Sequence, residues 1–200
     1  SPGAEYTGTN VGNIADITAF SFFSNKNLTT GEGGMIVTND NAFYEKVQYY
    51  KNMCFSYNGP RNYIHNNIGF NYRISNLHSA IGLAQVEKAE EYVAKRIKNS
   101  ELYKKYLLQM PGIQPQATKP YVRHAKWMNG VVVDTEKYGK TRTELINHLK
   151  EKNIDSRIFF VGMHKQPSLL EYGCDGSGDY SVTDWLAENG FYLPSASTLK

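Results

Sequence analysis

The sequence predicts a mixed α/β protein that ends in a smaller α+β unit. Three observations lead to this fold class: an early strand–turn–strand–helix order, a long proline-free helical stretch, and a second run of elements behind a proline-rich linker. The 200 residues are enough to bury the core of one domain, or of a main body with an appendage. We expect the change of domain near Gly112, which divides the chain into residues 1–111 and 112–200.

The first fifty residues alternate between strand and helix patterns. The run "ADITAFSFF" places β-branched and aromatic residues in alternation, which predicts a strand over residues 16–23. A glycine cluster, "GEGG", follows, and the apolar run "GGMIVT" is typical of a second strand. Asn39 or Asp40 can then cap a helix on which Phe43 and Val47 recur at helical spacing.

The middle of the chain contains a loop, a helical stretch and a linker. Residues 54–73 are rich in Asn, Gly and Tyr and are predicted to form a loop. Residues 75–110 lack proline and carry apolar residues in helical phase, which predicts a long helix. Three prolines in residues 111–120 indicate a linker.

The pattern of strands and helices restarts beyond this linker. The runs "WMNGVVVD" and "IDSRIFF" predict strands. Thr141 and Glu144 form a capping-box pattern that opens a short helix. Ser181 and Asp184 have the same spacing, and Gly190 is expected to end the helix that they open.

Composition and charge exclude several classes of protein. The net charge of +3 comes without a block of Lys or Arg, so no nucleic-acid surface is indicated. Cys54 and Cys174 are far apart and have no His or Cys neighbours at zinc-ligand spacing, so we expect no metal site and a reducing compartment. No apolar run is long enough to cross a membrane, and "SPGAEYTGTN" does not resemble an export signal. The expected location is the cytoplasm, with no membrane partner.

The stretch "SFFSNKNLTTGEGGM", from Ser21 to Met35, places one lysine between a strand and a glycine cluster. A phosphate-binding P-loop requires Gly-Lys-Ser/Thr at its end, and a dinucleotide-binding fingerprint requires glycines that open a helix, so both fail on spacing. A lysine that forms an imine with an aldehyde cofactor fits, because this amine follows a rigid strand end. From the local sequence alone, an ordinary surface lysine is the favoured interpretation of Lys26, because most lysines are solvated.

Several motifs in order along the chain resemble the DegT/DnrJ/EryC1/StrS family of pyridoxal-phosphate-dependent nucleotide-sugar aminotransferases. They are the Ser21–Met35 stretch, "IGFNYRISNLHSAIGLAQVEK", "WMNGVVV", "IDSRIFFVGMHKQP" and "LPS". Within the family, "NYR" and "MHKQP" look most like GDP-perosamine synthases. The resemblance implies part of a fold type I aminotransferase, with a portion of the large domain followed by a small α+β C-terminal domain.

The resemblance also implies roles for individual residues. Lys26 would bind pyridoxal 5'-phosphate covalently and act in catalysis, and Ser21 would donate its hydroxyl to the cofactor phosphate. Asn71 would reach the cofactor phosphate of a neighbouring subunit, which implies a homodimer. Arg73 would face the phosphates of the sugar nucleotide, although a surface arginine at a helix start fits the local sequence as well.

In the C-terminal part, Arg157 and His164 are expected to line the substrate pocket by the same resemblance. A single histidine is otherwise just as compatible with a structural hydrogen bond.

The implied reaction moves an amino group from an amino acid, expected to be glutamate, to a nucleotide-linked keto-6-deoxy sugar in surface polysaccharide or O-antigen biosynthesis. Two alternatives remain open. One is a related enzyme for a UDP- or dTDP-linked sugar, or one that acts at C3 instead of C4. The other is a non-catalytic regulatory or binding protein with the same fold.

Family members extend beyond both ends of the matching region. The carboxylate that pairs with the pyridine nitrogen would precede Ser1, and a C-terminal helix would follow Lys200. We therefore expect the 200-residue chain alone to be inactive in transamination.

Overall fold

The computed structural model describes residues 1–56, 59–60 and 62–199, and it divides into two compact units. The first unit comprises Ser1–Ala94 and Lys119–Trp127, and the second comprises Lys95–Thr118 and Met128–Lys200. The domain division expected from the sequence, at residues 111 and 112, stays a prediction. The loop expected over residues 54–73 includes residues 57, 58 and 61, which lie outside the described residues.

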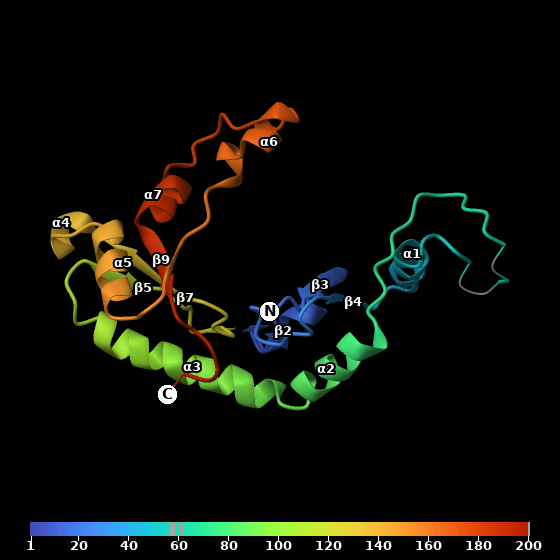
Figure 1. Ribbon diagram of the computed structural model, residues 1–200, viewed down its shortest axis with the longest axis horizontal. Helices are drawn as coiled ribbons and strands as arrows, with labels where there is room; N and C mark the ends of the chain where they lie inside the picture. The colour runs from blue at the N-terminus through green and yellow to red at the C-terminus, as the bar shows by residue number, and fades with distance from the viewer. Residues whose placement is uncertain (57–58, 61, 200) are drawn as a thin grey trace. The chain divides into compact units, whose positions relative to one another are not determined.

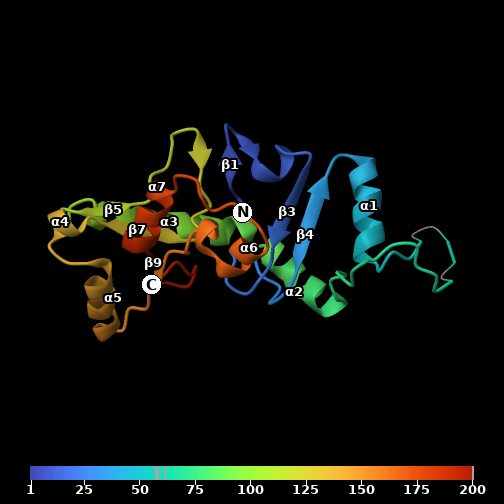
Figure 2. The ribbon, with the colours of Figure 1, turned by 90° about the horizontal axis from the view of Figure 1, so that it is seen from above.

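The first unit contains two small antiparallel sheets. Its strands are β1 (Glu5–Tyr6), β2 (Thr9–Asn10), β3 (Ile17–Ser21), β4 (Gly34–Thr38) and β6 (Val122–Arg123). β3 pairs with β4 so that Ser21 lies opposite Gly34, and the other sheet has the order β2-β1-β6. The strand–turn–strand–helix order predicted for the first fifty residues is therefore confirmed, and helix α1 packs beside β4 (Figure 2).

The helices that begin in the first unit are the 3-10 helix η1 (Val11–Asn13), α1 (Asn41–Lys51), α2 (Asn76–Val86) and α3 (Ala89–Leu107). Side chains cap the first turns of α1 and α2. The carboxylate of Asp40 accepts hydrogen bonds from the N–H groups of Ala42 and Phe43, and the Ser75 hydroxyl accepts one from the His78 N–H. Asp40 thus caps α1, as one of the two candidates predicted from the sequence.

The long helix predicted over residues 75–110 is interrupted. α2 ends at Val86 and α3 begins at Ala89, so they are separate helices (Figure 1). Neither glycine nor proline lies at residues 87 and 88, and the local sequence therefore carries no signal for the break. None of the helices in the described part of the chain combines the length and the apolar character needed to cross a membrane.

The second unit is built on one antiparallel sheet of order β5-β7-β9-β8. The strands are β5 (Ile113–Pro115), β7 (Asn129–Val133), β8 (Arg157–Ile158) and β9 (Gly190–Leu193). The helices wholly within this unit are α4 (Thr135–Tyr138), α5 (Arg142–Glu151), the 3-10 helix η2 (Met163–Lys165), α6 (Pro167–Glu171) and α7 (Ser181–Asn189).

One face of this sheet forms the hydrophobic core. Val131 and Val133 point to the core because side chains alternate along β7, and Phe191 lies opposite Val131 on β9. Each of these three residues is at most 1% exposed. Side chains from α3, α4 and α5 cover them: Tyr103, Leu107, Tyr138, Leu145, Ile146 and Leu149.

Both predicted helix starts in this unit are confirmed, but only one of them has a capping box. The capping box of Thr141 and Glu144 is present at the start of α5. α7 begins at Ser181 and is ended by Gly190, as predicted, but its N-cap position is Tyr180, which makes no side-chain capping hydrogen bond. The Ser181 N–H donates instead to the carboxylate of Asp179, two residues earlier. Gly190 begins β9 directly, with extended backbone.

Candidate active site

Lys26 lies in the connection between β3 and β4, which we call the lysine loop (residues 22–33). The base of this loop is closed by two backbone hydrogen bonds, from Phe22 N–H to Gly33 O (2.9 Å) and from Thr30 N–H to Phe22 O (2.9 Å). The Lys26 N–H also donates to Phe23 O at 3.0 Å. The loop is therefore a fixed turn that presents a half-buried lysine beside the end of a strand.

Gly33 closes the lysine loop in a conformation that other residues rarely adopt. Its φ angle is +138°, and a Cβ atom at this position would lie 2.8 Å from Thr30 Oγ1. The Thr30 side chain is itself fixed, because it is 2% exposed and its hydroxyl donates to Glu32 O at 2.6 Å. The turn after Lys26 thus requires glycine for both backbone and steric reasons.

Ser21, the predicted phosphate ligand, ends β3 immediately before the lysine loop. Its side chain is exposed, and its hydroxyl oxygen accepts a hydrogen bond from the Phe23 N–H at 3.4 Å. An accepting hydroxyl keeps its own proton, which can be donated to an anion. Ser21 and Lys26 are therefore held on the same short stretch of ordered chain.

A segment from much later in the sequence contacts the lysine loop. Residues 119–127, here the return segment, belong to the first unit although their chain neighbours on both sides belong to the second. The indole Nε1 of Trp127 donates to Asn25 O at 2.8 Å, and the buried Asn27 side chain donates to Ala125 O at 2.9 Å. The Lys26 ammonium lies 3.6 Å from the centre of the Trp127 ring. These contacts were not predicted from the sequence, where "WMNGVVVD" was interpreted as a strand from Trp127 onward.

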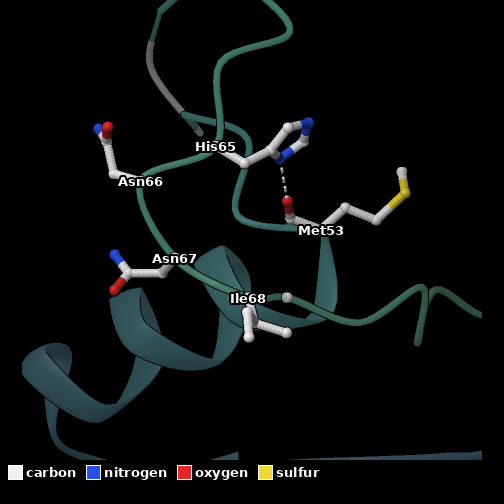
Figure 3. Close-up of a pocket in the computed structure, with 6 residues that line it drawn as sticks. Met53, His65, Asn66, Asn67 and Ile68 are labelled. Atoms are coloured by element: carbon white, nitrogen blue, oxygen red, sulfur yellow. Dashed lines mark hydrogen bonds between the residues drawn. The ribbon is translucent and has the colours of Figure 1, made fainter.

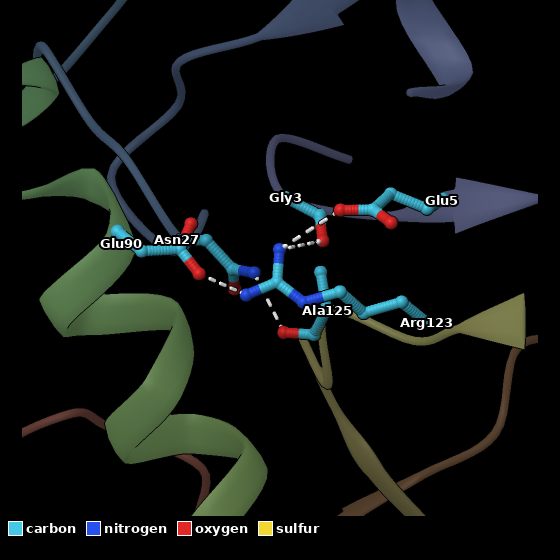
Figure 4. Close-up of polar contacts among 6 residues, drawn as sticks. All are labelled: Gly3, Glu5, Asn27, Glu90, Arg123 and Ala125. Atoms are coloured by element: carbon cyan, nitrogen blue, oxygen red, sulfur yellow. Dashed lines mark hydrogen bonds and ion pairs between the residues drawn. The ribbon is translucent and has the colours of Figure 1, made fainter. Parts of the chain in front are cut away.

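Arg123 anchors the return segment to the rest of the first unit. Its guanidinium donates to Gly3 O at 3.0 Å and forms ion pairs with Glu5 and Glu90 (Figure 4). Figure 4 also shows the hydrogen bond from Asn27 to Ala125 O close to this cluster. The return segment is therefore fixed by charged groups near its middle and by the lysine loop at its end.

Asn71 and Arg73 are brought together by the structure. Both side chains are exposed, and Arg73 Nε donates to Asn71 Oδ1 at 3.3 Å. Asn71 also forms an isolated antiparallel bridge with Asn52 at the end of α1. Neither side chain hydrogen-bonds to the lysine loop in the described part of the chain, and their predicted roles stay predictions.

His164 and Arg157 belong to the second unit. His164 Nε2 lies 3.0 Å from Asp184 Oδ1, and its ring stacks on Tyr180 with centroids 4.0 Å apart. Lys165 Nζ also contacts Asp184, at 2.8 Å, and this hydrogen bond is the main reason that the pKa of Asp184 is lowered. His164 therefore has a structural partner, whereas Arg157 lies exposed on β8. Their predicted contact with substrate stays a prediction.

A surface pocket of about 450 Å³ lies in the first unit, lined by Met53 and residues 65–69 (Figure 3). The His65 ring within it bonds to Met53 O at 2.7 Å, as the dashed line in Figure 3 marks. None of the predicted site residues lines this pocket, so it does not contain the expected chemistry. Within the described ranges no cluster of His, Cys, Asp and Glu side chains could hold a metal ion.

The chain belongs to the DegT/DnrJ/EryC1/StrS aminotransferase family, whose sequence model matches residues 1–200. It is 36% identical over 197 residues to the GDP-perosamine synthase of Escherichia coli O157:H7, covering 98% of this chain and 51% of that protein. It is also 36% identical over 201 residues to the GDP-perosamine synthase of Caulobacter vibrioides, covering 98% and 52%. The family predicted from the motifs is confirmed, and the chain spans about half the length of the curated relatives it matches.

Solved structures confirm the predicted fold class. Spr1654 of Streptococcus pneumoniae in its PLP form superposes with a TM-score of 0.86 at 21% identity, covering 100% of this chain and 52% of the other. Helicobacter pylori PseC, an aminotransferase involved in pseudoaminic acid biosynthesis, gives a TM-score of 0.87 at 21% identity, covering 100% and 53%. The chain thus has the α/β fold of these aminotransferases, and pyridoxal phosphate is confirmed as the cofactor of this family and fold.

The residues of the lysine loop and of the two strand ends that it joins fit this cofactor. An aldehyde requires a primary amine, which Lys26 supplies, and a phosphate requires hydroxyl or N–H donors, of which Ser21 supplies one. Gly33 and Gly34 leave the turn free of side chains, and a Cβ at Gly34 would lie 2.7 Å from Phe20 O. The chemistry of the donor set therefore agrees with the family.

Proposed function

We propose that this chain carries the catalytic lysine of a pyridoxal-phosphate-dependent aminotransferase that acts on a nucleotide-linked keto-6-deoxy sugar. The observation that carries the proposal is the half-buried amine of Lys26, held between the end of β3 and the Gly33 turn in a member of this family. Glutamate is the proposed amino donor. A GDP-linked sugar is the proposed acceptor, because GDP-perosamine synthases are among the relatives at 36% identity.

Bound pyridoxal phosphate supplies an electron sink that stabilises negative charge at the α-carbon of the amino donor. Lys26 would hold the aldehyde carbon covalently and, as a released amine, would take the proton from that α-carbon and return it to the product. Ser21 would donate its hydroxyl proton to the cofactor phosphate and so orient the cofactor relative to Lys26. Arg73, Arg157 and His164 are proposed to bind the sugar nucleotide.

We further propose a homodimer in which Asn71 completes the site of the neighbouring subunit. The exposed position of Asn71 supports this, as do the exposed apolar residues of α2, including Leu77 at 81% and Leu83 at 63%. The proposed setting is surface polysaccharide biosynthesis in the cytoplasm. The names of relatives support the polysaccharide pathway, among them a spore coat polysaccharide biosynthesis protein of Bacillus subtilis at 32% identity.

Borohydride reduction in the presence of pyridoxal phosphate tests the lysine assignment directly. Peptide mapping should find the pyridoxyl group on Lys26, and Lys26→Arg should remove it because a guanidinium does not form an imine. Lys46→Arg, at an exposed position on α1, is the matched control and should leave the label in place. A label on another lysine would contradict the assignment, and no specific label would favour a non-catalytic protein with this fold.

The substrate is tested with the protein encoded by the complete gene, glutamate, and a panel of GDP-, UDP- and dTDP-linked 3-keto and 4-keto sugars. We expect amino-sugar product from the GDP-linked 4-keto-6-deoxy sugar. Turnover only with a UDP- or dTDP-linked sugar would replace the proposed substrate. The 200-residue chain assayed alone should give no product, and turnover by it would contradict the expectation that the site needs further residues.

The shared site is tested by subunit complementation in the complete protein. Lys26→Ala and Asn71→Ala variants are expected to be inactive separately, and mixed dimers should regain one functional site. Failure to regain activity in verified mixed dimers would contradict the proposed role of Asn71.

A further inference from the structure

The return segment holds the lysine loop at three successive residues. Asn25 accepts the indole N–H of Trp127, Lys26 places its ammonium over the ring of Trp127, and Asn27 donates to Ala125 O. The backbone carbonyl of the residue before Lys26, the side chain of the residue after it and the end of the Lys26 side chain are therefore all in contact with one short stretch of chain.

From this arrangement we propose that Trp127 is a positioning residue for the catalytic lysine. The hydrogen bond to Asn25 O fixes the indole plane, and the face of that plane receives the ammonium group at 3.6 Å. An aromatic face attracts a cation electrostatically, and it does so without forming a bond that must later be broken. Trp127 thus holds Lys26 when this lysine is free of the cofactor and its side chain is an ammonium group.

The inference rests on the proposed function, since it assigns Trp127 to the same site. During transamination a lysine that has released its cofactor must remain within reach of the donor α-carbon, although its side chain has four rotatable bonds. Contact with the indole face restricts those rotations. Trp127 lies at the end of the return segment and contacts the lysine loop only through non-covalent interactions. It can therefore restrict the Lys26 side chain without taking part in bond formation.

Asn27 supports the same function from the backbone side. It is 5% exposed, its amide nitrogen bonds to the return segment, and it adjoins Lys26 in the chain. A buried hydrogen bond across two segments fixes the backbone from which the lysine side chain extends. The return segment is in turn fixed by the ion pairs of Arg123 with Glu5 and Glu90.

Reductive methylation with ¹³C-formaldehyde tests the proposal on the 200-residue chain without cofactor. Dimethyl-lysine keeps its positive charge, so the contact with the ring is retained. The ring current of Trp127 should move the Lys26 methyl resonance upfield of those of exposed lysines such as Lys98, and Lys26→Arg identifies the resonance. In Trp127→Leu the Lys26 methyl resonance should move to the position of the exposed lysines. In Trp127→Phe it should retain part of its upfield shift.

The rate of methylation provides a second measurement in the same samples. Loss of the aromatic face should raise the rate at Lys26 by about two- to fivefold relative to Lys98, the range expected for a partly exposed cation–π contact. Trp185→Leu, which removes the other tryptophan, is the matched control and should change neither the shift nor the rate at Lys26.

The outcomes separate this inference from the proposed function. A Lys26 resonance that coincides with those of exposed lysines in the unaltered chain, or one unchanged by Trp127→Leu, would overturn the positioning role. A pyridoxyl label on a different lysine would instead overturn the proposed function, whatever the methyl resonances show. Trp127→Phe gives a folded comparison of similar shape if Trp127→Leu fails to fold.

Discussion

Substitution of Gly33 by alanine should destabilise the first unit more than the same substitution at Gly31. Both glycines lie in the lysine loop with positive φ angles, +83° at Gly31 and +138° at Gly33. At Gly31 a Cβ would have nothing within 4 Å, so only left-handed backbone strain of about 1–2 kcal/mol is expected. Gly33→Ala should lower the free energy of unfolding by about 2–4 kcal/mol. Backbone strain contributes about 1–3 kcal/mol of this, and displacement of the hydrogen-bonded Thr30 hydroxyl adds to it.

Urea unfolding followed by tryptophan fluorescence measures this difference. In a Trp185→Phe background the emission comes from Trp127, which lies against the lysine loop, so the signal reports on the first unit. A difference of about 1–2 kcal/mol corresponds to a midpoint lower by about 0.5–1 M urea for Gly33→Ala, with a slope of about 2 kcal/mol/M. Gly31→Asn should cost less than Gly31→Ala, because asparagine adopts left-handed backbone more readily. Equal midpoints for the two alanine variants would refute the steric argument at Gly33.

Three further predictions concern other parts of the chain. Phe191→Ala should lower the free energy of unfolding of the second unit by about 3–5 kcal/mol, because a side chain that is 1% exposed leaves a cavity; calorimetry would measure this, and a loss below about 1 kcal/mol would contradict the assigned core. Thr141→Ala should lower the free energy of unfolding by about 1 kcal/mol through loss of the α5 cap, whereas Ser181→Ala should leave it almost unchanged. Equal losses of stability in urea titrations would show that the caps are wrongly assigned. Burial, followed by the positive charge of Lys126, lowers the pKa of His124 from its ordinary value of 6.5, so the unfolded chain takes up this proton first. Stability should therefore fall as the pH decreases below about 6.5, and His124→Asn should show a weaker loss in the same titration.

The features that could be predicted from the sequence depend on residues close together in the chain. Asp40 and Thr141 cap their helices because each side chain needs only an N–H group two or three residues away. Ser181 has the same sequence pattern as Thr141. In a capping box Asp184 would accept the N–H of Ser181, but that N–H donates to the carboxylate of Asp179 instead. Spacing alone did not distinguish the two.

The lysine of the candidate site was found from the sequence, but its surroundings were not. Ser21, Lys26 and Gly33 lie in one short motif, and the strand end and glycine turn fix them locally. The contacts of Lys26 with Trp127 and of His164 with Asp184 join residues far apart in the chain. The one signal for these contacts was Trp127 itself, because the indole N–H of a tryptophan that is partly buried usually donates a hydrogen bond. That signal does not identify the acceptor.

The origin of the return segment has a consequence for biosynthesis. Its contacts with Gly3, Asn25 and Asn27 span 98–120 residues of chain. Closing a loop of about 100 residues costs about 4 kcal/mol of entropy in addition to a constant, and a ribosome needs about 5–20 s to add that many residues. Throughout that interval the lysine loop has been synthesised and Trp127 has not, so the final contacts of the loop form only after translation has passed the proline-rich linker at residues 111–120.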